Sequence, residues 1–243
     1  QTIGSFVGFG GAGAVECMAL AGMDYCIVDT EHGPYDVEST MDFIRAAEMH
    51  EMTPLVRVKD GNRNSILKML DIGAKGLIIP FLDTVDAMKD VVSYGKYFPL
   101  GDRGVAFGRG AGYGYADHAK KSLTEYFEIC NRETLLIPQC ECVGCLEHIE
   151  EIVALDGIDG IFVGPFDLSA SMGMPGQFDH PDFKAAVARI LKACKDQGKL
   201  SIVFCSDSKV AKTRLEQGFD SVMVACDYTI FTEACQNILK ELR

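Results

Sequence analysis

"YCIVDTEHGPYDVESTMDFIRAAEMH", residues 25–50, contains the unit from which the fold can be deduced. Its first five residues are mostly apolar and form a candidate buried strand. A Gly-Pro pair at 33–34 then stops the strand pattern. Residues 37–50 place Met41, Ile44 and Ala47 at helical spacing. The stretch therefore predicts a strand, a polar loop and a helix, in that order.

The same order recurs along the whole chain of 243 residues. Helical patterns cover 37–50, 65–73 and 180–198, and the last begins near a Pro and ends on a Gly. Strands that alternate with helices pair in parallel through right-handed crossovers. Eight such units in about 250 residues are typical of a TIM barrel. The eight candidate strands are 5–9, 25–29, 54–58, 76–81, 135–141, 160–165, 201–205 and 221–226.

The fold class predicted is therefore α/β, a (β/α)8 TIM barrel formed by one domain over residues 1–243. The alternative is an open doubly wound sheet, but no Gly-x-Gly-x-x-Gly follows a strand to support dinucleotide binding. An extended loop of about fifty residues separates the fourth and fifth strands, and loops of this length are usually functional lids or disordered. A C-terminal helix, 229–243, has apolar residues suited to packing on a neighbour or on its own barrel.

Composition narrows the class of protein. The net charge of −12 and the pI of about 4.8 argue against a nucleic-acid surface, which needs a basic stripe. No run approaches the ~18 apolar residues that span a bilayer, and no signal peptide opens the chain. The ten cysteines are best interpreted as reduced thiols packed in a core. We therefore expect a cytoplasmic protein.

Polar residues gather where the predicted strands end. In a TIM barrel these carboxyl ends form the active site. Each residue alone has an ordinary structural explanation, but together they predict a shared site. Glu141 and Asp167, from neighbouring strands, form the hard oxygen pair that Mg²⁺ or Mn²⁺ prefers. The full set is Asp29, Glu31, His32, Arg57, Gln139, Glu141, Asp167 and Asp227.

These segments resemble the HpcH/HpaI aldolase family, metal-dependent pyruvate aldolases on a modified TIM barrel. The resemblance runs from about residue 16 to residue 230, and its Glu-His-Gly and Gly-Pro-x-Asp-Leu-Ser elements are specific in combination. The segments that carry it are "DTEHGPYD", "PLVRV", "LDIGAKGLIIP", "GDRGVAFGR", "PQCE", "GIDGIFVGPFDLSASMG" and "VACD".

The resemblance implies an aldolase that cleaves a 4-hydroxy-2-oxo acid to pyruvate and an aldehyde through a metal-stabilised enolate. It assigns a divalent cation (Mg²⁺, Mn²⁺ or Co²⁺) to Glu141 and Asp167. It makes His32 the residue that transfers a proton through a metal-bound water, with Asp71 as its partner, and Arg57 the stabiliser of the enolate. It also implies a homo-oligomer, a trimer or a hexamer. The residues implied to line the substrate site are Asp29, Gln139, Gly164, Pro165 and Phe166.

Two positions depart from the family pattern. Phe166 stands where a small residue is common, so a ring there would narrow the pocket or change the aldehyde preference. Gly110 stands where the family often has alanine after Arg109, in the loop expected on the acceptor side of the site.

Four alternatives remain open from the sequence. Cys140, Cys142 and Cys145 with nearby His148 suggest a metal or iron–sulfur site, although no second ligand pair follows. A Schiff-base aldolase would need a desolvated lysine, and Lys59 is the nearest candidate. The remaining two are a CoA-ester lyase of the same superfamily and a non-catalytic barrel that binds a 2-oxo acid or a metal.

Overall fold

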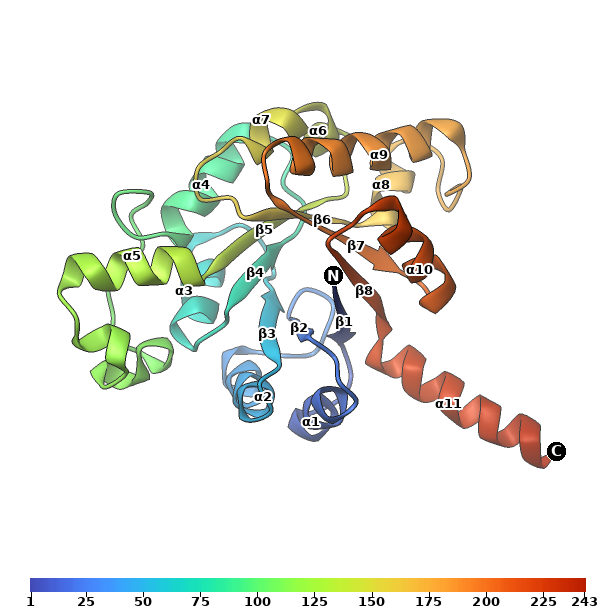
Figure 1. Ribbon diagram of the computed structural model, residues 1–243, viewed down its shortest axis with the longest axis horizontal. Helices are drawn as coiled ribbons and strands as arrows, with labels where there is room; N and C mark the ends of the chain where they lie inside the picture. The colour runs from blue at the N-terminus through green and yellow to red at the C-terminus, as the bar shows by residue number, and fades with distance from the viewer.

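Eight parallel strands close into a barrel in strict chain order (Figure 1). The computed structural model describes residues 1–243. Pairing of the first strand with the last excludes the open sheet and confirms the predicted TIM barrel. All eight predicted strands are present: β1 (Thr2–Val7), β2 (Tyr25–Asp29), β3 (Thr53–Arg57), β4 (Gly76–Ile79), β5 (Leu135–Cys140), β6 (Gly160–Val163), β7 (Leu200–Cys205) and β8 (Ser221–Cys226).

Helices follow the strands and cover the outside of the barrel (Figure 1). The predicted helix over 37–50 is α2, whose first turn is fixed by a capping box between Asp36 and Ser39. The α-helices are α1 (Ala12–Leu20), α2 (Val37–Met49), α3 (Arg63–Asp71), α4 (Val85–Gly95), α5 (Leu123–Glu133), α6 (Val143–Glu147), α7 (Ile149–Val153), α8 (Pro165–Ser171), α9 (Pro181–Asp196), α10 (Ser208–Gln217) and α11 (Asp227–Leu242); two 3₁₀ helices are η1 (Arg109–Gly114) and η2 (Asp117–Lys120).

Apolar side chains fill the inside of the barrel. They form a cluster of nine buried residues, separate from the larger core between the strands and the helices. Side chains alternate between the two faces of a strand, so each strand contributes every second residue to the interior. The nine residues are Phe6, Tyr25, Ile27, Leu55, Ile78, Ile137, Phe162, Ile202 and Met223.

Polar residues form the next inward-facing layer, toward the carboxyl ends of the strands. The same alternation that points Ile27 and Leu55 inward also points residues two positions later inward. These are Asp29 and Arg57, which are direct partners in the β2–β3 register. Gln139, two positions after Ile137, is likewise buried. The two-residue alternation of side chains along the strands therefore places charged and polar groups inside the carboxyl end of the barrel.

The connection between β4 and β5 contains α4 and α5, and its middle part, residues 96–122, lies at the other end of the barrel. Arg103 Nη2 donates to Asp71 Oδ1 at 3.0 Å, and Arg109 donates to the Ile72 carbonyl oxygen at 3.0 Å. Both acceptors lie where α3 ends and the chain turns back into β4. A Cβ on Gly110 would lie only 3.0 Å from the Leu70 carbonyl oxygen, so a larger residue at this position would crowd the end of α3. Within this chain the segment packs against the end of α3, away from the carboxyl ends of the strands, so it does not form the lid that its length suggests.

The C-terminal helix α11 leaves the barrel instead of packing along it (Figure 1). Beyond its first turn it carries exposed apolar side chains, including Phe231, Ile238 and Leu242. The predicted helix is confirmed. It does not pack on its own barrel, and a single chain contains no neighbour on which it could pack. None of the helices combines the length and apolar character needed to traverse a bilayer.

A buried lysine joins the start of two strands to the end of α4. The Lys96 side chain is 1% exposed, and its Nζ lies 2.9 Å from Asp159 Oδ2. It also donates to the carbonyl oxygens of Asn131 and Thr134. Asp159 precedes β6 and Thr134 precedes β5, so one ammonium group connects three segments. Removing it would take a charged donor from all three acceptors, which lie in a part-buried site.

We expect Lys96→Met to lower the free energy of unfolding by about 3 kcal/mol, because breaking a buried ion pair leaves its partner uncompensated. Lys89→Met in the same helix is the matched control, since the Lys89–Asp86 pair is exposed to solvent and its loss should leave the stability nearly unchanged. Urea unfolding monitored by circular dichroism measures both. Equal effects for the two variants would contradict the role assigned to Lys96.

Candidate active site

A cavity of about 350 Å³ opens at the carboxyl ends of the strands. It collects eight residues expected at the site: Asp29, His32, Arg57, Gln139, Gly164, Pro165, Phe166 and Asp167. It also contains residues that sequence reasoning missed: Phe6, Phe162, Phe204, Cys226, Tyr228 and Thr229. Strand alternation would have found Phe204, which follows the inward-facing Ile202 by two positions. Tyr228 gave no such signal because it lies in a helix.

Arg57 is held rigidly by Asp29. The guanidinium donates to both carboxylate oxygens, from Nε at 2.9 Å and from Nη2 at 2.6 Å, and both side chains are buried. The Arg57 guanidinium carbon also lies 4.5 Å from the centre of the Phe6 ring. A bidentate pair of this kind fixes orientation as well as charge. Arg57 therefore presents a pre-oriented cation to the cavity.

Asp29 also shapes the loop that follows β2. Its Oδ1 accepts the backbone N–H groups of Glu31 at 3.1 Å and of His32 at 3.2 Å. Its oxygens are thus engaged by Arg57 and by this turn. Asp29 lines the cavity and organises the residues around it, and its expected contact with the substrate stays a prediction.

Glu31, one of the acids predicted at the site, points toward Arg57. Its Oε2 lies 3.3 Å from Arg57 Nη1. Burial raises the pKa of Glu31, against the opposing effects of Arg57 and His32, and the charges of Asp29 and Asp167 raise it further. Loop conformation, which the sequence pattern does not specify, decided this orientation.

Glu141 is buried at the end of β5 and fixed by two donors. Oε1 accepts the Phe81 backbone N–H at 2.7 Å, and Oε2 accepts Gln139 Nε2. Burial raises the pKa of Glu141, and the nearby charges of Glu31 and Asp167 act in the same direction. The carboxylate is therefore held in place while its negative charge lacks a cationic partner.

Asp167 lies in the first turn of α8, directly after β6, and lines the same cavity. The charge of its carboxyl contributes to the raised pKa of both Glu31 and Glu141. No side chain caps the start of α8, which leaves the amides of Phe166 and Asp167 free of a capping partner.

His32 and Phe166 lie at the edge of the cavity. The His32 side chain is 71% exposed, and its Nε2 is 3.8 Å from Glu31 Oε2. Phe166 packs edge-on against Phe178 and Phe204, with ring centres 5.1 and 5.7 Å apart. The departure from the family pattern at Phe166 therefore builds an aromatic wall on one side of the cavity.

Asp71 does not join these residues within the chain. It ends α3, at the end of the barrel opposite the carboxyl ends of the strands, and its carboxylate is paired with Arg103 at 3.0 Å. The expected pairing of Asp71 with His32 is therefore not formed in this structure. A helix that follows a strand returns the chain to the amino ends, which explains the position.

Residues 3–234 match the HpcH/HpaI aldolase/citrate lyase family. The chain belongs to this family. The finding confirms the resemblance and the prediction of an enzyme, a carbon–carbon lyase of the aldolase type.

Similar proteins include named aldolases. The hydroxypyruvate/pyruvate aldolase of Cupriavidus necator is 34% identical over 230 residues, covering 94% of this chain and 83% of that protein. The 2-keto-3-deoxy-L-rhamnonate aldolase of Klebsiella pneumoniae is 34% identical over 221 residues, covering 90% of this chain and 80% of that protein. A crystal structure of an HpcH/HpaI aldolase from Desulfitobacterium hafniense has a TM-score of 0.92 at 27% identity, covering 100% and 92% of the two chains.

The donor set of this family member fits a divalent cation. Arg57 is the only arginine or lysine that lines the cavity, and Asp29 already binds it. Gln139 Oε1 is buried and has no hydrogen-bond partner, so it can accept from a water or a ligand. No three His, Cys, Asp or Glu side chains converge closely enough to hold a metal alone. Glu141 and Asp167 thus offer two ligands and leave the other positions to water and substrate.

The lysine and cysteine alternatives find no support in the site. Lys59 is exposed and lines a different hollow, between α2 and α3, so it lacks the desolvation that a Schiff-base lysine needs. Cys140 and Cys145 are buried against each other, and their contact raises the pKa of Cys140. His148 instead pairs with Glu151 at 3.2 Å on the surface. The cysteines therefore behave as core residues.

Proposed function

We propose that this chain is an aldolase that reversibly cleaves a 4-hydroxy-2-oxo acid to pyruvate, or a related 2-oxo acid, and an aldehyde. The names of similar proteins support this reaction. The observation that carries the proposal is a cavity lined by Asp167 and the pre-oriented Arg57, with buried Glu141 directly behind its lining residues Gln139 and Gly164. This is the arrangement needed to bind a 2-oxo acid and stabilise the negative oxygen that forms on it.

We propose that Glu141 and Asp167 hold the divalent cation, Mg²⁺, Mn²⁺ or Co²⁺. When bound, the cation supplies a Lewis acid that polarises the ketone of the 2-oxo acid. Glu141 is suited to this role because the Phe81 amide and Gln139 fix its orientation before any ligand arrives. The excess of carboxylates over cations in the cavity makes a positive ion electrostatically favourable.

The remaining groups orient the substrate. Arg57 places its guanidinium where negative charge develops on the ketone oxygen, and Asp29 prevents it from moving. The free amide groups of Phe166 and Asp167 at the start of α8, next to Gly164 and Pro165, suit the substrate carboxylate. The unpartnered Oε1 of Gln139 offers a further acceptor inside the cavity.

His32 is proposed to move the proton. In cleavage, the 4-hydroxyl loses its proton to a base as the carbon–carbon bond breaks and the aldehyde leaves. The His32 imidazole lies at the cavity mouth, where one of its ring nitrogens can accept and return that proton. The hydrogen bond from the His32 backbone N–H to Asp29 fixes the position of the loop that carries the imidazole ring.

Two further properties are proposed from less specific observations. All ten cysteines are free, which supports a reducing compartment such as the cytoplasm. The exposed apolar residues of the projecting α11 support a homo-oligomer, a trimer or a hexamer, that covers them. The partners are otherwise small molecules, with no nucleic acid and no membrane among them.

Pyruvate release from a panel of 4-hydroxy-2-oxo acids tests the function. We expect turnover that EDTA abolishes and added Mg²⁺, Mn²⁺ or Co²⁺ restores. Glu141→Gln and Asp167→Asn should each lower kcat/KM at least about a hundredfold, because each removes a ligand of the polarising cation. Glu147→Gln, an exposed acid in the neighbouring α6, is the matched control and should retain activity.

Other outcomes separate the alternatives. Turnover that survives EDTA and is trapped by borohydride in the presence of pyruvate would indicate Schiff-base chemistry. Cleavage of CoA esters without pyruvate release would favour a CoA-ester lyase. Metal and pyruvate binding without any turnover would indicate the non-catalytic barrel.

Light scattering tests the oligomer. We expect the full chain to have three or six times the mass of one protomer, because an isolated α11 would leave its apolar side chains in water. Phe231→Ser with Leu242→Ser should lower the assembly mass, whereas Lys240→Ser in the same helix should not. A monomer at micromolar concentration for the full chain would contradict the proposal.

A further inference from the structure

Asp227, at the start of α11, binds the loop that follows β1. Its Oδ2 accepts the backbone N–H groups of Phe9 at 3.2 Å and of Gly10 at 2.7 Å, and its Oδ1 accepts that of Gly8 at 3.0 Å. The side chain is buried, so three charge-assisted hydrogen bonds to one carboxylate form a rigid connection. Asp227 was expected to be one of the acids of the active site, and the structure instead uses it as a clamp.

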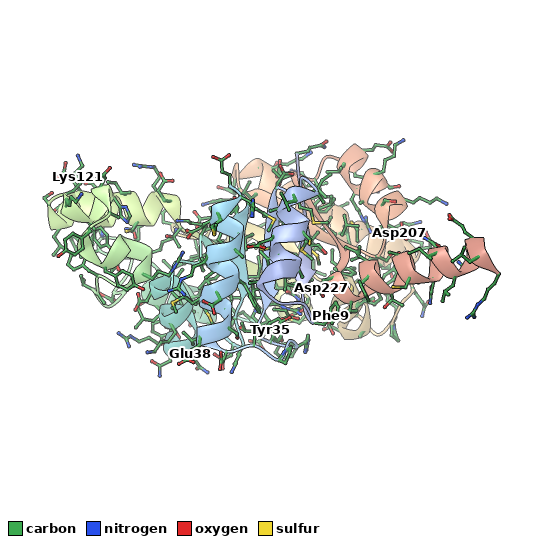
Figure 2. All side chains as sticks on the ribbon, turned by 90° about the horizontal axis from the view of Figure 1, so that it is seen from below. Phe9, Tyr35, Glu38, Lys121, Asp207 and Asp227 are labelled. Carbon is green, nitrogen blue, oxygen red and sulfur yellow. The ribbon has the colours of Figure 1, made fainter.

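The clamp extends to the loop that carries His32. The Tyr35 hydroxyl donates to the Gly10 carbonyl oxygen at 2.6 Å, and Tyr35 lies three positions after His32. Figure 2 shows Phe9, Tyr35 and Asp227 close together at the base of α11. The ring of Phe9 also contacts that of Phe231, with centres 5.9 Å apart. The loops after β1, β2 and β8 therefore form one connected unit.

Tyr228, the residue after Asp227, belongs to the wall of the cavity. It lines the cavity together with Thr229, and its ring packs against Gly8, where an added Cβ would lie 3.0 Å from Cε1. Tyr228 is 50% exposed, so a ligand in the cavity can reach its side chain. The neighbouring Cys226 thiol and burial raise the pKa of Tyr228 to about 12, so the phenol stays protonated and able to donate.

We propose that Tyr228 contacts the aldehyde portion of the substrate and that Asp227 is the positioning residue that holds it there. The inference rests on the proposed function and adds a residue to it. The hydroxyl of Tyr228 donates to the oxygen of the aldehyde, or to the 4-hydroxyl from which that oxygen derives.

The position of Tyr228 in the barrel decides which end of the substrate it meets. The groups proposed for the 2-oxo acid end, Glu141, Gln139 and Asp167, come from β5 and from the start of α8 after β6. Tyr228 follows β8, which pairs with β1, and β1 pairs in turn with β2, the strand that leads to Asp29 and His32. The carbons that leave as the aldehyde must extend from the oxo-acid end toward the proton-transferring His32. Tyr228 lies on that side.

Two assays distinguish an effect at the oxo-acid end of the substrate from an effect at the aldehyde end. Exchange of the pyruvate methyl protons in D₂O, followed by ¹H NMR, needs only the oxo-acid end. Condensation of pyruvate with glycolaldehyde needs both ends. We expect Tyr228→Phe to keep the exchange rate within about twofold while the KM for glycolaldehyde rises about fivefold, the loss of one neutral hydrogen bond. Asp227→Asn should show the same split.

Each outcome bears on the inference. Tyr115→Phe, at an exposed tyrosine in the loop at the other end of the barrel, is the control and should change neither assay. An unchanged KM for glycolaldehyde in Tyr228→Phe would overturn the proposal, as would equal losses in both assays. If Asp227→Asn does not fold, Tyr228→Phe alone decides. Absence of methyl exchange in the unmodified protein would refute the proposed function itself, and this inference with it.

Discussion

The ion pair between Arg57 and Asp29 is the interaction on which the site depends. The pair is bidentate and buried, and it joins the last residues of two neighbouring strands. It uses the only guanidinium of the cavity to neutralise one carboxylate, although Glu31 approaches the same group. Glu141 and Asp167 are therefore left without a cation. Their mutual repulsion is the physical basis of the divalent ion that we propose at this position.

This imbalance of charge follows from the geometry of strands. One inward-facing layer of the barrel consists of buried apolar side chains. Because side chains alternate along a strand, the residue two positions after each of these also faces inward. Asp29, Arg57 and Gln139 occupy that next layer because each lies two residues beyond an interior apolar residue. Glu141 lies two positions further still. The same packing that stabilises the barrel thus places the polar groups at its carboxyl end. Burial raises the pKa of Glu141, so the ionised carboxylate lowers the stability of the fold, and the proposed cation would offset this cost.

The strands and the acids at their carboxyl ends were predictable because both follow from period-two alternation and parallel pairing. The family resemblance suggested Asp71 as the partner of His32. It did not indicate that α3 carries Asp71 to the opposite end of the barrel within one chain. The orientation of Glu31 and the path of the loop around Gly110 depend on loop conformation, which periodicity does not encode. The amphipathic pattern of α11 fits its own barrel and a neighbour equally well, so only the structure shows it leaving the barrel.

Titration of Mn²⁺ into metal-free protein, followed by the electron paramagnetic resonance signal of the free ion, tests the charge argument without any assumption about the reaction. The account predicts one Mn²⁺ bound per chain, with the affinity weakened at least about tenfold in Glu141→Gln. Equal Mn²⁺ affinity for this variant and the unmodified protein, or no binding by either, would contradict the claim that these carboxylates await a cation.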